Sequence, residues 1–463
     1  MKRFTIAFIP FLFAVTALLA ETPQSSKTQP PNVVFILVDD WGWTDAGCYG
    51  SDFYETPQID RLAMDGVRFT QAYSACTVCS PSRAAILTGK YPARLHLTDW
   101  IPGYQPPESL LLSPEWNKGL ELSEYTIAEE FKSRGYTTGI VGKWHLGGDK
   151  FKPELQGFDF NFAGCHVGSP RSFFPPYGLP VKIDEKPGEM LTDRLTREAI
   201  GFIEAHQQQP FFLYLSYYAV HIPVAGKPEI VDKYKKKLMN GSYHHTNPEY
   251  AAMLQTVDEN LGKIRETLKQ LGISDRTVLI LASDNGGFIG RKDVKPSTSN
   301  APLRAGKGSA YSGGVRVPLI VRWPGVTPTE GVCETPVKGV DFYPTLLEIV
   351  DGAYEPRPDI DGTSFALWLR NPENSLRGPV FWHYPHYHPG GATPYSAVRY
   401  GDWKLIHFYE DGRYELYNLA EDIGESHDLA VARPKIVQEL RAMLEDWLER
   451  EDAQFPRRRE DPS

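Results

Sequence analysis

Short unbroken apolar runs alternate with longer amphipathic stretches through the first three quarters of the chain. Unbroken runs bounded by polar residues are typical of strands buried on both faces of a largely parallel sheet. Five lie at residues 33–38 (VVFILV), 139–141, 211–215, 278–281 and 319–321. Between them, residues 126–134 and 248–271 repeat apolar side chains at the helical period of about 3.6 residues. The alternation predicts an α/β fold in which helices cover both faces of a large, mostly parallel sheet.

The pattern changes after about residue 371. Strand-like runs follow at residues 395–398, 403–408 and 414–417, separated by the turn sequences Gly401-Asp402 and Asp411-Gly412. A helical pattern then covers residues 434–450. We therefore expect a main domain over residues 32–370 and a C-terminal subdomain over 371–456, a small antiparallel sheet with a packed helix. The charged tail, 457–463, is expected to fray.

The N-terminus has the pattern of an export signal. Met1-Lys2-Arg3 precedes an apolar run that ends at Ala20, which matches the basic and apolar regions of a signal peptide over residues 1–20. A membrane anchor is the alternative, but the run is short for a bilayer span and contains Pro10. Residues 21–31 are polar and indicate a linker. We expect an exported protein, periplasmic or secreted, without stable membrane insertion after cleavage.

Composition and charge narrow the function classes. With 463 residues, of which 41% are hydrophobic, the chain can build a large core without disulfide staples. The net charge of -9 provides no field that would concentrate a polyanion, so nucleic acid is not an expected partner. The five cysteines, Cys48, Cys76, Cys79, Cys165 and Cys333, are too few for a disulfide scaffold, and their odd number indicates that at least one has another role.

Two acidic pairs follow apolar runs directly. Asp39-Asp40 comes after the run at 33–38 and Asp284-Asn285 after the run at 278–281. Ligands of α/β sheets bind beyond the carboxyl ends of the strands, so we expect the two pairs to converge. Either pair alone could be a turn. Together, their carboxylate and amide oxygens are hard ligands that suit Ca²⁺ better than Zn²⁺.

The segment from Cys79 to Gly89 decides the class. It reads CSPSRAAILTG and fits the pattern C-x-P-S-R-x-x-x-L-T-G at every fixed position, so the chain resembles the sulfatase family. The resemblance implies that a formylglycine-generating enzyme oxidises Cys79 to formylglycine. A buried structural cysteine is the alternative, while Cys76 lacks the Pro-Ser-Arg that must follow. Pro81 and Ser82 suit a first helical turn, and an anion is favoured at such a helix N-terminus.

The resemblance extends over nearly the whole chain after the linker. It implies an alkaline-phosphatase-like fold, with residues 32–370 as the catalytic domain, and one Ca²⁺ held by Asp39, Asp40, Asp284 and Asn285 together with the group made from Cys79. It further implies that the catalytic residues are Cys79, Arg83, Lys143, His145, His221 and Lys307.

The family mechanism assigns a role to each of these side chains. A hydroxyl of the aldehyde hydrate attacks sulfur, His221 protonates the leaving alcohol, and His145 takes the proton whose loss expels sulfate. Lys143, Lys307 and Arg83 offset charge on the sulfonyl oxygens. One position departs from the family pattern, because Ser312 stands before Gly313-Gly314 where a glutamate is usual. A missing carboxylate would change the local field and the orientation of the lysine.

The substrate is less clearly marked. Residues 97–103 (LTDWIPG) and 381–388 (FWHYPHYH) resemble pocket segments of exported bacterial sulfatases that act on sugars, particularly galactose or N-acetylgalactosamine units. Aromatic rings stack on sugars, and polar side chains bond their hydroxyls. We expect Asp99, Trp100, His383 and His386 to bind substrate and the enzyme to act on chain ends. Two alternatives apply to the histidine cluster. It could be a loop at the subdomain junction, or a second metal site formed by His383, His386 and His388.

Two other functions remain open at this point. The alkaline-phosphatase superfamily also contains phosphodiester and phosphonate ester hydrolases. A non-catalytic glycan-binding relative would fit the Ser312 departure, although binding alone would not need Cys79.

Overall fold

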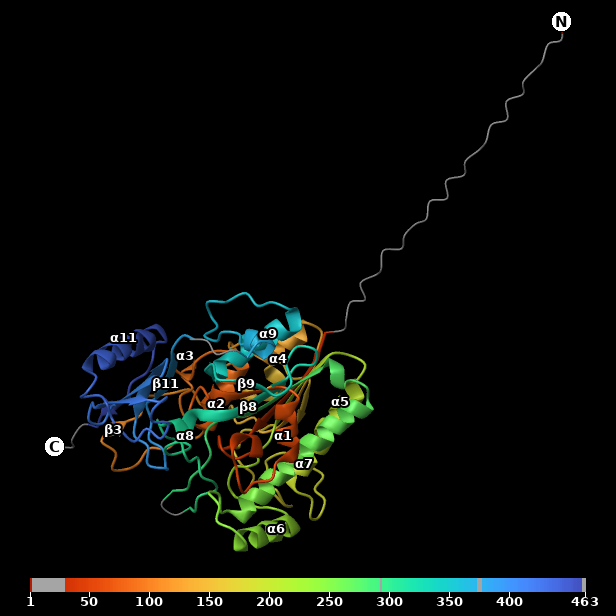
Figure 1. Ribbon diagram of the computed structural model, residues 1–463, viewed down its shortest axis with the longest axis horizontal. Helices are drawn as coiled ribbons and strands as arrows, with labels where there is room; N and C mark the ends of the chain where they lie inside the picture. The colour runs from red at the N-terminus through yellow and green to blue at the C-terminus, as the bar shows by residue number, and fades with distance from the viewer. Residues whose placement is uncertain (2–29, 292–293, 373–376, 460–463) are drawn as a thin grey trace.

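The computed structural model describes residues 1, 30–291, 294–372 and 377–459 of the chain (Figure 1). All of the predicted signal segment except Met1, and the linker up to residue 29, lie outside these residues. Among the helices of the described part, none is long and apolar enough to cross a membrane.

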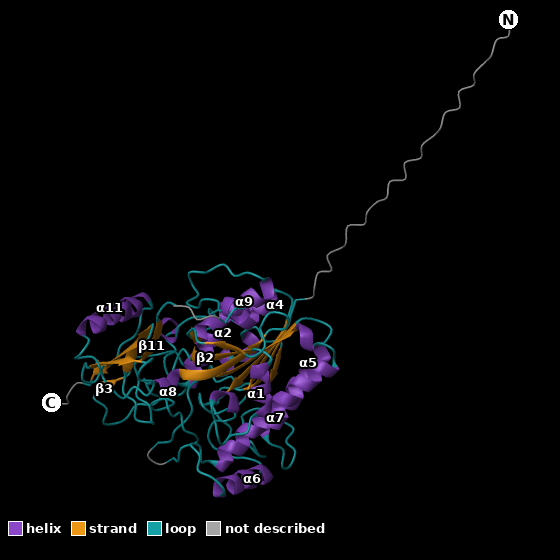
Figure 2. Ribbon diagram, in the orientation of Figure 1, coloured by secondary structure: helices purple, strands orange, loops and turns teal. Residues whose placement is uncertain are grey.

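A large mixed sheet forms the centre of the molecule, as predicted (Figure 2). Within the described residues it has nine strands in the order β10-β2-β8-β7-β1-β6-β4-β5, and β9 also pairs with β2. Strand β8 is antiparallel to its neighbours β2 and β7, and the other pairings are parallel. The strands are β1 (Asn32–Val38), β2 (Val67–Tyr73), β4 (Thr137–Gly142), β5 (Phe160–Phe162), β6 (Phe211–Ser216), β7 (Thr277–Ser283), β8 (Arg316–Arg322), β9 (Gly331–Cys333) and β10 (Val337–Lys338).

Helices cover both faces of this sheet. One face carries α1 (Pro57–Met64), α5 (Leu191–His206), α6 (Pro228–Met239) and α7 (Pro248–Gln270). The other carries α2 (Cys79–Thr88), α4 (Ile127–Ser133) and α9 (Phe342–Asp351). Short helices α3 (Pro92–Leu95), α8 (Ser312–Val315) and α10 (Ala366–Arg370) connect the larger elements. The predicted helices at 126–134 and 248–271 correspond to α4 and α7.

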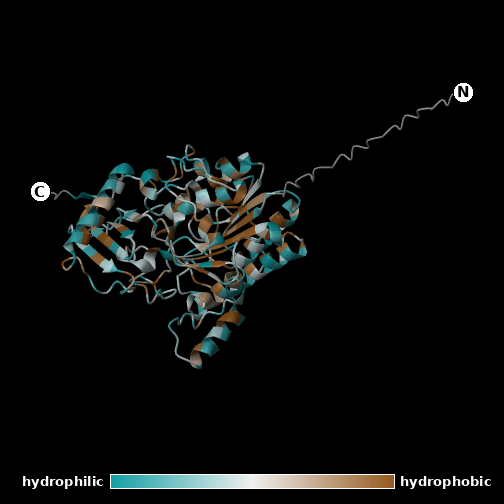
Figure 3. Ribbon diagram, turned by 45° about the horizontal axis from the view of Figure 1, so that its top comes forward, coloured by the Kyte–Doolittle hydropathy of each residue, from teal (hydrophilic) through white to brown (hydrophobic). Residues whose placement is uncertain are grey.

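The alternating side chains of β1 divide between two hydrophobic cores. Val34 and Ile36 pack with α1, α5 and α7, whereas Val33 and Phe35 pack with α2, α4 and α9. A strand whose two faces are both covered needs apolar residues at every position, which explains the unbroken run in the sequence. The hydropathy colouring shows the same arrangement, with brown strands between helices whose outer faces are teal (Figure 3).

A separate antiparallel sheet lies at the C-terminal end of the chain and is called the C-terminal sheet below. It consists of β11 (Val380–Tyr384), β12 (Tyr395–Tyr400), β13 (Trp403–Phe408) and β14 (Tyr414–Asn418), in that order, and α11 (Pro434–Arg450) packs on it (Figure 1). Trp447 of α11 stacks on Phe381 with ring centroids 4.8 Å apart. The Trp382 indole N–H donates to the Ser74 carbonyl at 2.9 Å, which ties this sheet to the segment before α2.

The end of the chain differs from the expected frayed tail. Arg457–Arg458 form strand β15, which pairs antiparallel with β3 (Leu111–Leu112). Backbone hydrogen bonds do not depend on side-chain charge, so an arginine pair can form an edge strand once a partner is beside it. Residues 460–463 lie outside the described part.

Candidate active site

The predicted site residues come from the carboxyl ends of neighbouring parallel strands. Strands β7, β1, β6 and β4 are adjacent and parallel, so their carboxyl ends meet at one edge of the sheet. Asp39 and Asp40 follow β1, Asp284 and Asn285 follow β7, and Lys143 follows β4. Helix α2 begins at Cys79 and adds the predicted nucleophile. The sheet topology therefore brings the predicted metal ligands together with Lys143 and Cys79.

Three carboxylates form the centre of this site. Asp39, Asp40 and Asp284 are 0–1% exposed, and one oxygen from each lies within 4.8 Å of the others. Asn285 donates its amide N–H to Asp40 Oδ1 at 2.7 Å. Asp39 Oδ1, Asp40 Oδ2 and Asn285 Oδ1 are buried without a hydrogen-bond partner. Buried oxygens are normally satisfied, so three orphaned ones in a single cluster indicate that a cation belongs there.

Three cations balance these carboxylates. Lys143 Nζ lies 2.6 Å from Asp39 Oδ2, and Lys307 Nζ lies 2.7 Å from Asp40 Oδ1. Burial opposes ionisation of Asp284, but Arg83 and Lys143 outweigh it and lower the pKa of that carboxyl. Burial instead raises the pKa of Asp39 well above its usual range. With all six groups ionised the formal charges sum to zero, and a bound divalent ion would make the site cationic, which suits an anionic substrate.

Arg83 directs its donors at the protein. Its Nε and Nη2 atoms lie 3.0 and 2.8 Å from Asp284 Oδ2, while Nη1 donates to the Lys143 carbonyl at 3.1 Å and to Ser216 Oγ at 2.5 Å. The side chain is 1% exposed. In this arrangement Arg83 orients Asp284 and Lys143, and its contribution to the charge of the site comes from behind them.

Cys79 faces a histidine whose tautomer follows from its neighbours. His145 Nε2 lies 2.6 Å from the Ile101 carbonyl, which can only accept, so Nε2 carries a proton. Burial, followed by the charge of Lys143, holds the pKa of His145 well below its usual range, so the ring is neutral. Nδ1 is therefore unprotonated. It lies 3.3 Å from Cys79 Sγ, in position to accept a proton from a group at residue 79.

His221 lies beside Asp40. Its Nδ1 donates to the Ile222 carbonyl at 2.7 Å, and its Nε2 is 3.6 Å from Asp40 Oδ2. Burial and the nearby Lys307 lower the pKa of His221 to about 3. A negatively charged ester beside the ring would act in the opposite direction and favour its protonation.

The backbone at the site has unusual conformations. Asp40 and His145 both have φ of 57°, a left-handed geometry that non-glycine residues rarely adopt and that costs roughly 1–3 kcal/mol at each position. The Asp40 N–H donates to Asp284 Oδ1, and the His145 N–H to the Cys165 carbonyl, and these bonds hold the two turns. At Gly142, a Cβ would lie 1.9 Å from the Ser216 carbonyl, so only glycine can precede Lys143 here.

A pocket of about 490 Å³ opens onto these groups. Cys79, His145, His221 and Lys307 line its floor together with Asp40, while Asp39, Asp284, Asn285, Arg83 and Lys143 lie behind that layer. The walls are largely apolar, with polar groups at a few points. The wall residues include Trp100, Ile101, Pro102, His166, Ile222, Phe288, Arg291 and His388.

The four residues expected to bind substrate are placed differently from one another. Trp100 lines the pocket. Asp99 is buried and accepts the Tyr384 hydroxyl at 2.8 Å, and His386 Nε2 lies 2.7 Å from Thr98 Oγ1. His383 lies between Ser396 Oγ and the Gln454 carbonyl, at 2.7 and 2.8 Å. The structure therefore brings Trp100 to the pocket and not the other three, and the metal-ligand cluster found among the described residues does not include the histidines.

His388 lines the pocket, although the sequence suggested it only as a third ligand of a second metal site. The nearby sequence 381–388 signals an aromatic and histidine-rich segment, but β11 ends at Tyr384 and the chain then turns. Alternation along a strand does not predict which histidine after the turn reaches the pocket.

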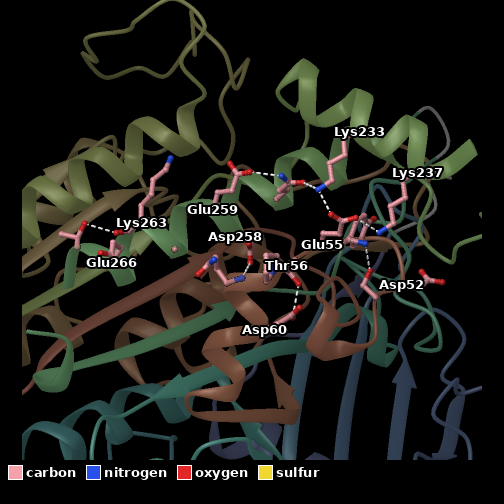
Figure 4. Close-up of a pocket in the computed structure, with 17 residues that line it drawn as sticks. Asp52, Glu55, Thr56, Asp60, Lys233, Lys237, Asp258, Glu259, Lys263 and Glu266 are labelled. Atoms are coloured by element: carbon pink, nitrogen blue, oxygen red, sulfur yellow. Dashed lines mark hydrogen bonds and ion pairs between the residues drawn. The ribbon is translucent and has the colours of Figure 1, made fainter. Parts of the chain in front are cut away.

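A second, larger hollow of about 1130 Å³ lies between α1 and the α6–α7 pair (Figure 4). Lys233 and Lys237 extend to Glu55, and Asp258 accepts the N–H groups of Gln58 and Ile59 at the start of α1. Both lysines are paired with Glu55, Lys263 is paired with Asp193, and the hollow shares no lining residue with the pocket at Cys79. We therefore assign the chemistry to the smaller pocket.

Comparisons with known proteins identify the family of the chain. The chain matches the family model described as Sulfatase over residues 31–353, and one described as N-sulphoglucosamine sulphohydrolase, C-terminal, over residues 306–454. A sulfatase of Formosa agariphila is 32% identical, with 98% of this chain and 95% of that protein aligned. Arylsulfatase A of Homo sapiens is 31% identical over 92% and 89% of the two chains. N-acetylgalactosamine-6-sulfatase of Rattus norvegicus is 36% identical over 74% of this chain and 65% of that protein.

Solved structures share the fold of this chain. The crystal structure of Ps i-CgsB superimposes with a TM-score of 0.77 at 29% identity, covering 91% of this chain and 93% of that one, and the same protein has been solved with k-i-k-neocarrahexaose. A phosphonate monoester hydrolase of Agrobacterium radiobacter shares the fold, with a TM-score of 0.63 at 20% identity over 89% of this chain and 96% of that one. Because the family match spans more than half of the chain, and relatives above 30% identity align along most of it, the chain belongs to the sulfatase family and is a sulfuric ester hydrolase.

Proposed function

We propose that this sulfatase removes sulfate from a sulfated carbohydrate, using an aldehyde made from Cys79 and a bound Ca²⁺. The observation that carries the proposal is the convergence of Cys79, at the start of α2, with the carboxylate cluster at the ends of β1 and β7. A buried cysteine in a merely structural role would not need a neutral imidazole nitrogen 3.3 Å from its sulfur.

The side chains present fit a hard divalent cation. Asp39, Asp40, Asp284 and Asn285 offer oxygens only, three of which have no hydrogen-bond partner. The group made from Cys79 would complete the ligand set. When bound, Ca²⁺ would polarise a sulfate oxygen and help to neutralise the ester.

The proton transfers would be divided between the two histidines of the pocket. A formylglycine hydrate at residue 79 would supply the attacking oxygen, and His145 Nδ1 is placed to accept a proton from it. His221 presents Nε2 to the pocket, where its protonated form would donate to the departing alcohol. Lys307 lies in the pocket floor and offsets charge on the sulfonyl oxygens, and Lys143 and Arg83 support it from behind.

The pocket supports a saccharide substrate. Its volume of about 490 Å³ suits one sugar unit at the cleavage site, and the Trp100 ring and apolar wall could pack against a sugar face. The His388 Nδ1 accepts the Gly390 N–H at 3.0 Å, so the neutral ring carries its proton on Nε2 and offers a donor. The relative named N-acetylgalactosamine-6-sulfatase supports an N-acetylgalactosamine or galactose unit, and the complex of Ps i-CgsB with k-i-k-neocarrahexaose supports a saccharide ligand.

Maturation and export form part of the same proposal. A formylglycine-generating enzyme would modify Cys79, and the segment 1–20 would direct the chain to the periplasm or the medium. N-terminal sequencing of the exported protein should begin after Ala17 or Ala20. Retention of Met1 in exported protein would contradict cleavage.

The test is a side-by-side assay of the calcium-loaded enzyme. Wild type should hydrolyse nitrophenyl sulfate much faster than nitrophenyl phosphate and should release sulfate from at least one member of a panel of sulfated galactose and N-acetylgalactosamine sugars. Cys79→Ala should be folded and inactive. Faster phosphate or phosphonate ester hydrolysis would favour the superfamily alternative, and saccharide binding without turnover would favour a glycan-binding relative.

A further inference from the structure

A buried ion pair joins the C-terminal sheet to the segment that carries Lys307. Glu425, in the turns after β14, and Lys404, on β13, are both 0% exposed, and Lys404 Nζ lies 2.7 Å from Glu425 Oε1. Glu425 Oε2 accepts the backbone N–H of Ser312 at 2.6 Å, and the Ser312 hydroxyl is 3.5 Å from Lys404 Nζ. A carboxylate from a distant part of the chain therefore lies beside position 312, where the family pattern has its own glutamate.

Simple stability does not explain this arrangement well. Burying both charges of a pair is costly, and apolar replacements of similar volume are often as stable. Glu425 also has φ of 49°, a strained geometry for a residue with a side chain. Backbone strain of this kind clusters at active sites, ligand clamps and switch regions, which favours a functional role for Glu425.

The segment from 304 to 314 is held on two sides. On the side of the C-terminal sheet, Arg304 Nη1 donates to the Glu425 carbonyl at 2.6 Å. On the other side, the Lys307 N–H donates to the Gly287 carbonyl at 3.1 Å, next to the predicted metal ligands, and the Gly308 N–H donates to the Thr77 carbonyl at 3.0 Å, next to the nucleophile. Lys307 thus lies between the ion pair and the catalytic loops.

We propose that Glu425 is a positioning residue for the sulfatase reaction. It supplies from the C-terminal sheet the carboxylate that Ser312 lacks, and with Lys404 it fixes the 304–314 segment so that Lys307 stays on Asp40 at the pocket floor. The inference rests on the proposed function of the site. It makes the C-terminal sheet a required part of the catalytic unit.

Moving the carboxylate back to position 312 tests the proposal. Turnover of nitrophenyl sulfate is measured for wild type, Glu425→Gln, Ser312→Glu and the double variant, on folded calcium-loaded enzyme well below its unfolding temperature. Each single variant should lose about tenfold or more in kcat/KM. Glu425→Gln leaves Lys404 without a carboxylate, whereas Ser312→Glu places two carboxylates beside Lys404. The double variant, with one carboxylate beside Lys404, should recover to within about threefold of wild type.

A matched control separates positioning from general destabilisation. Arg377 and Asp341 form another largely buried pair, 2.7 Å apart and outside the 304–314 segment. Arg377→Gln should lower the unfolding temperature but leave kcat/KM of the folded enzyme near wild type.

A second cycle tests whether the effect passes through Lys307. In a Lys307→Ala background, Glu425→Gln should cause no more than about a twofold further loss, because the group that it positions is gone. Full additivity with Lys307→Ala, or no rescue by Ser312→Glu, would overturn the inference while wild-type turnover still supported the proposed function. A wild type without sulfatase activity would instead contradict the proposed function itself.

Discussion

Replacing Arg83 with methionine should destabilise the protein more than it weakens substrate binding. The guanidinium makes two hydrogen bonds to Asp284 Oδ2, at 3.0 and 2.8 Å, and two more to the Lys143 carbonyl and Ser216 Oγ. Asp284 is 0% exposed, so the variant would leave a buried carboxylate without its main cation. Removing one partner of a buried pair costs about 3–5 kcal/mol.

Urea unfolding of the wild type and of Arg83→Met, followed by fluorescence in the presence of a calcium chelator, measures this loss. Arg83→Lys should be intermediate, because it keeps the charge but loses the fork of donors. Arg441→Met, which breaks an exposed ion pair on α11, should change the unfolding little. If Arg83→Met kept wild-type stability and only raised KM, the guanidinium would contact the substrate and our description of its role would be wrong.

Three further predictions follow from the same structure. Chelation of Ca²⁺ should abolish turnover, and added Ca²⁺ should restore it. Compared with protein in Ca²⁺ at a thousand times its Kd, the chelated protein should lose about 4 kcal/mol of unfolding free energy. Activity that resists the chelator would contradict the metal assignment. His388→Ala should raise KM for a sulfated sugar but not for nitrophenyl sulfate, whereas His407→Ala, outside the pocket, should change neither; equal effects on the two substrates would remove the saccharide role. Burial raises the pKa of Asp258 to about 7, so the ionised carboxylate destabilises the folded state. The free energy of unfolding should therefore fall by about 1.4 kcal/mol per pH unit between pH of about 4 and about 7, a loss of a few kcal/mol in total. Asp258→Asn, which can still accept both N–H groups, should match wild type at pH 4 and exceed it at pH 8; parallel pH–stability curves would refute this.

The sequence predicted those parts of the fold that a local pattern determines. The run at 33–38 became β1 because a strand covered on both faces needs apolar residues at every position. The pairs after β1 and β7 converged because parallel neighbours end at the same sheet edge. Both inferences need only the periodicity of a strand and the direction of the chain.

Other features depend on contacts that no local pattern records. The direction of the Arg83 donors is set by Asp284 and Ser216, which are 201 and 133 residues away along the chain. Glu425 reaches Ser312 across 113 residues, so the departure at 312 was visible in the sequence but its partner was not. His388 enters the pocket beyond the end of β11, where strand alternation no longer applies.

The direct test of the central claim is the chemical state of residue 79 in active enzyme. Protein produced with a formylglycine-generating enzyme is digested, and the peptide that contains residue 79 is examined by mass spectrometry after treatment with a thiol-alkylating reagent and a carbonyl-reactive hydrazide. We expect the peptide to carry an aldehyde that reacts with the hydrazide, in proportion to the turnover of nitrophenyl sulfate across preparations. A preparation with full sulfatase activity and a fully alkylated Cys79 thiol would contradict the account.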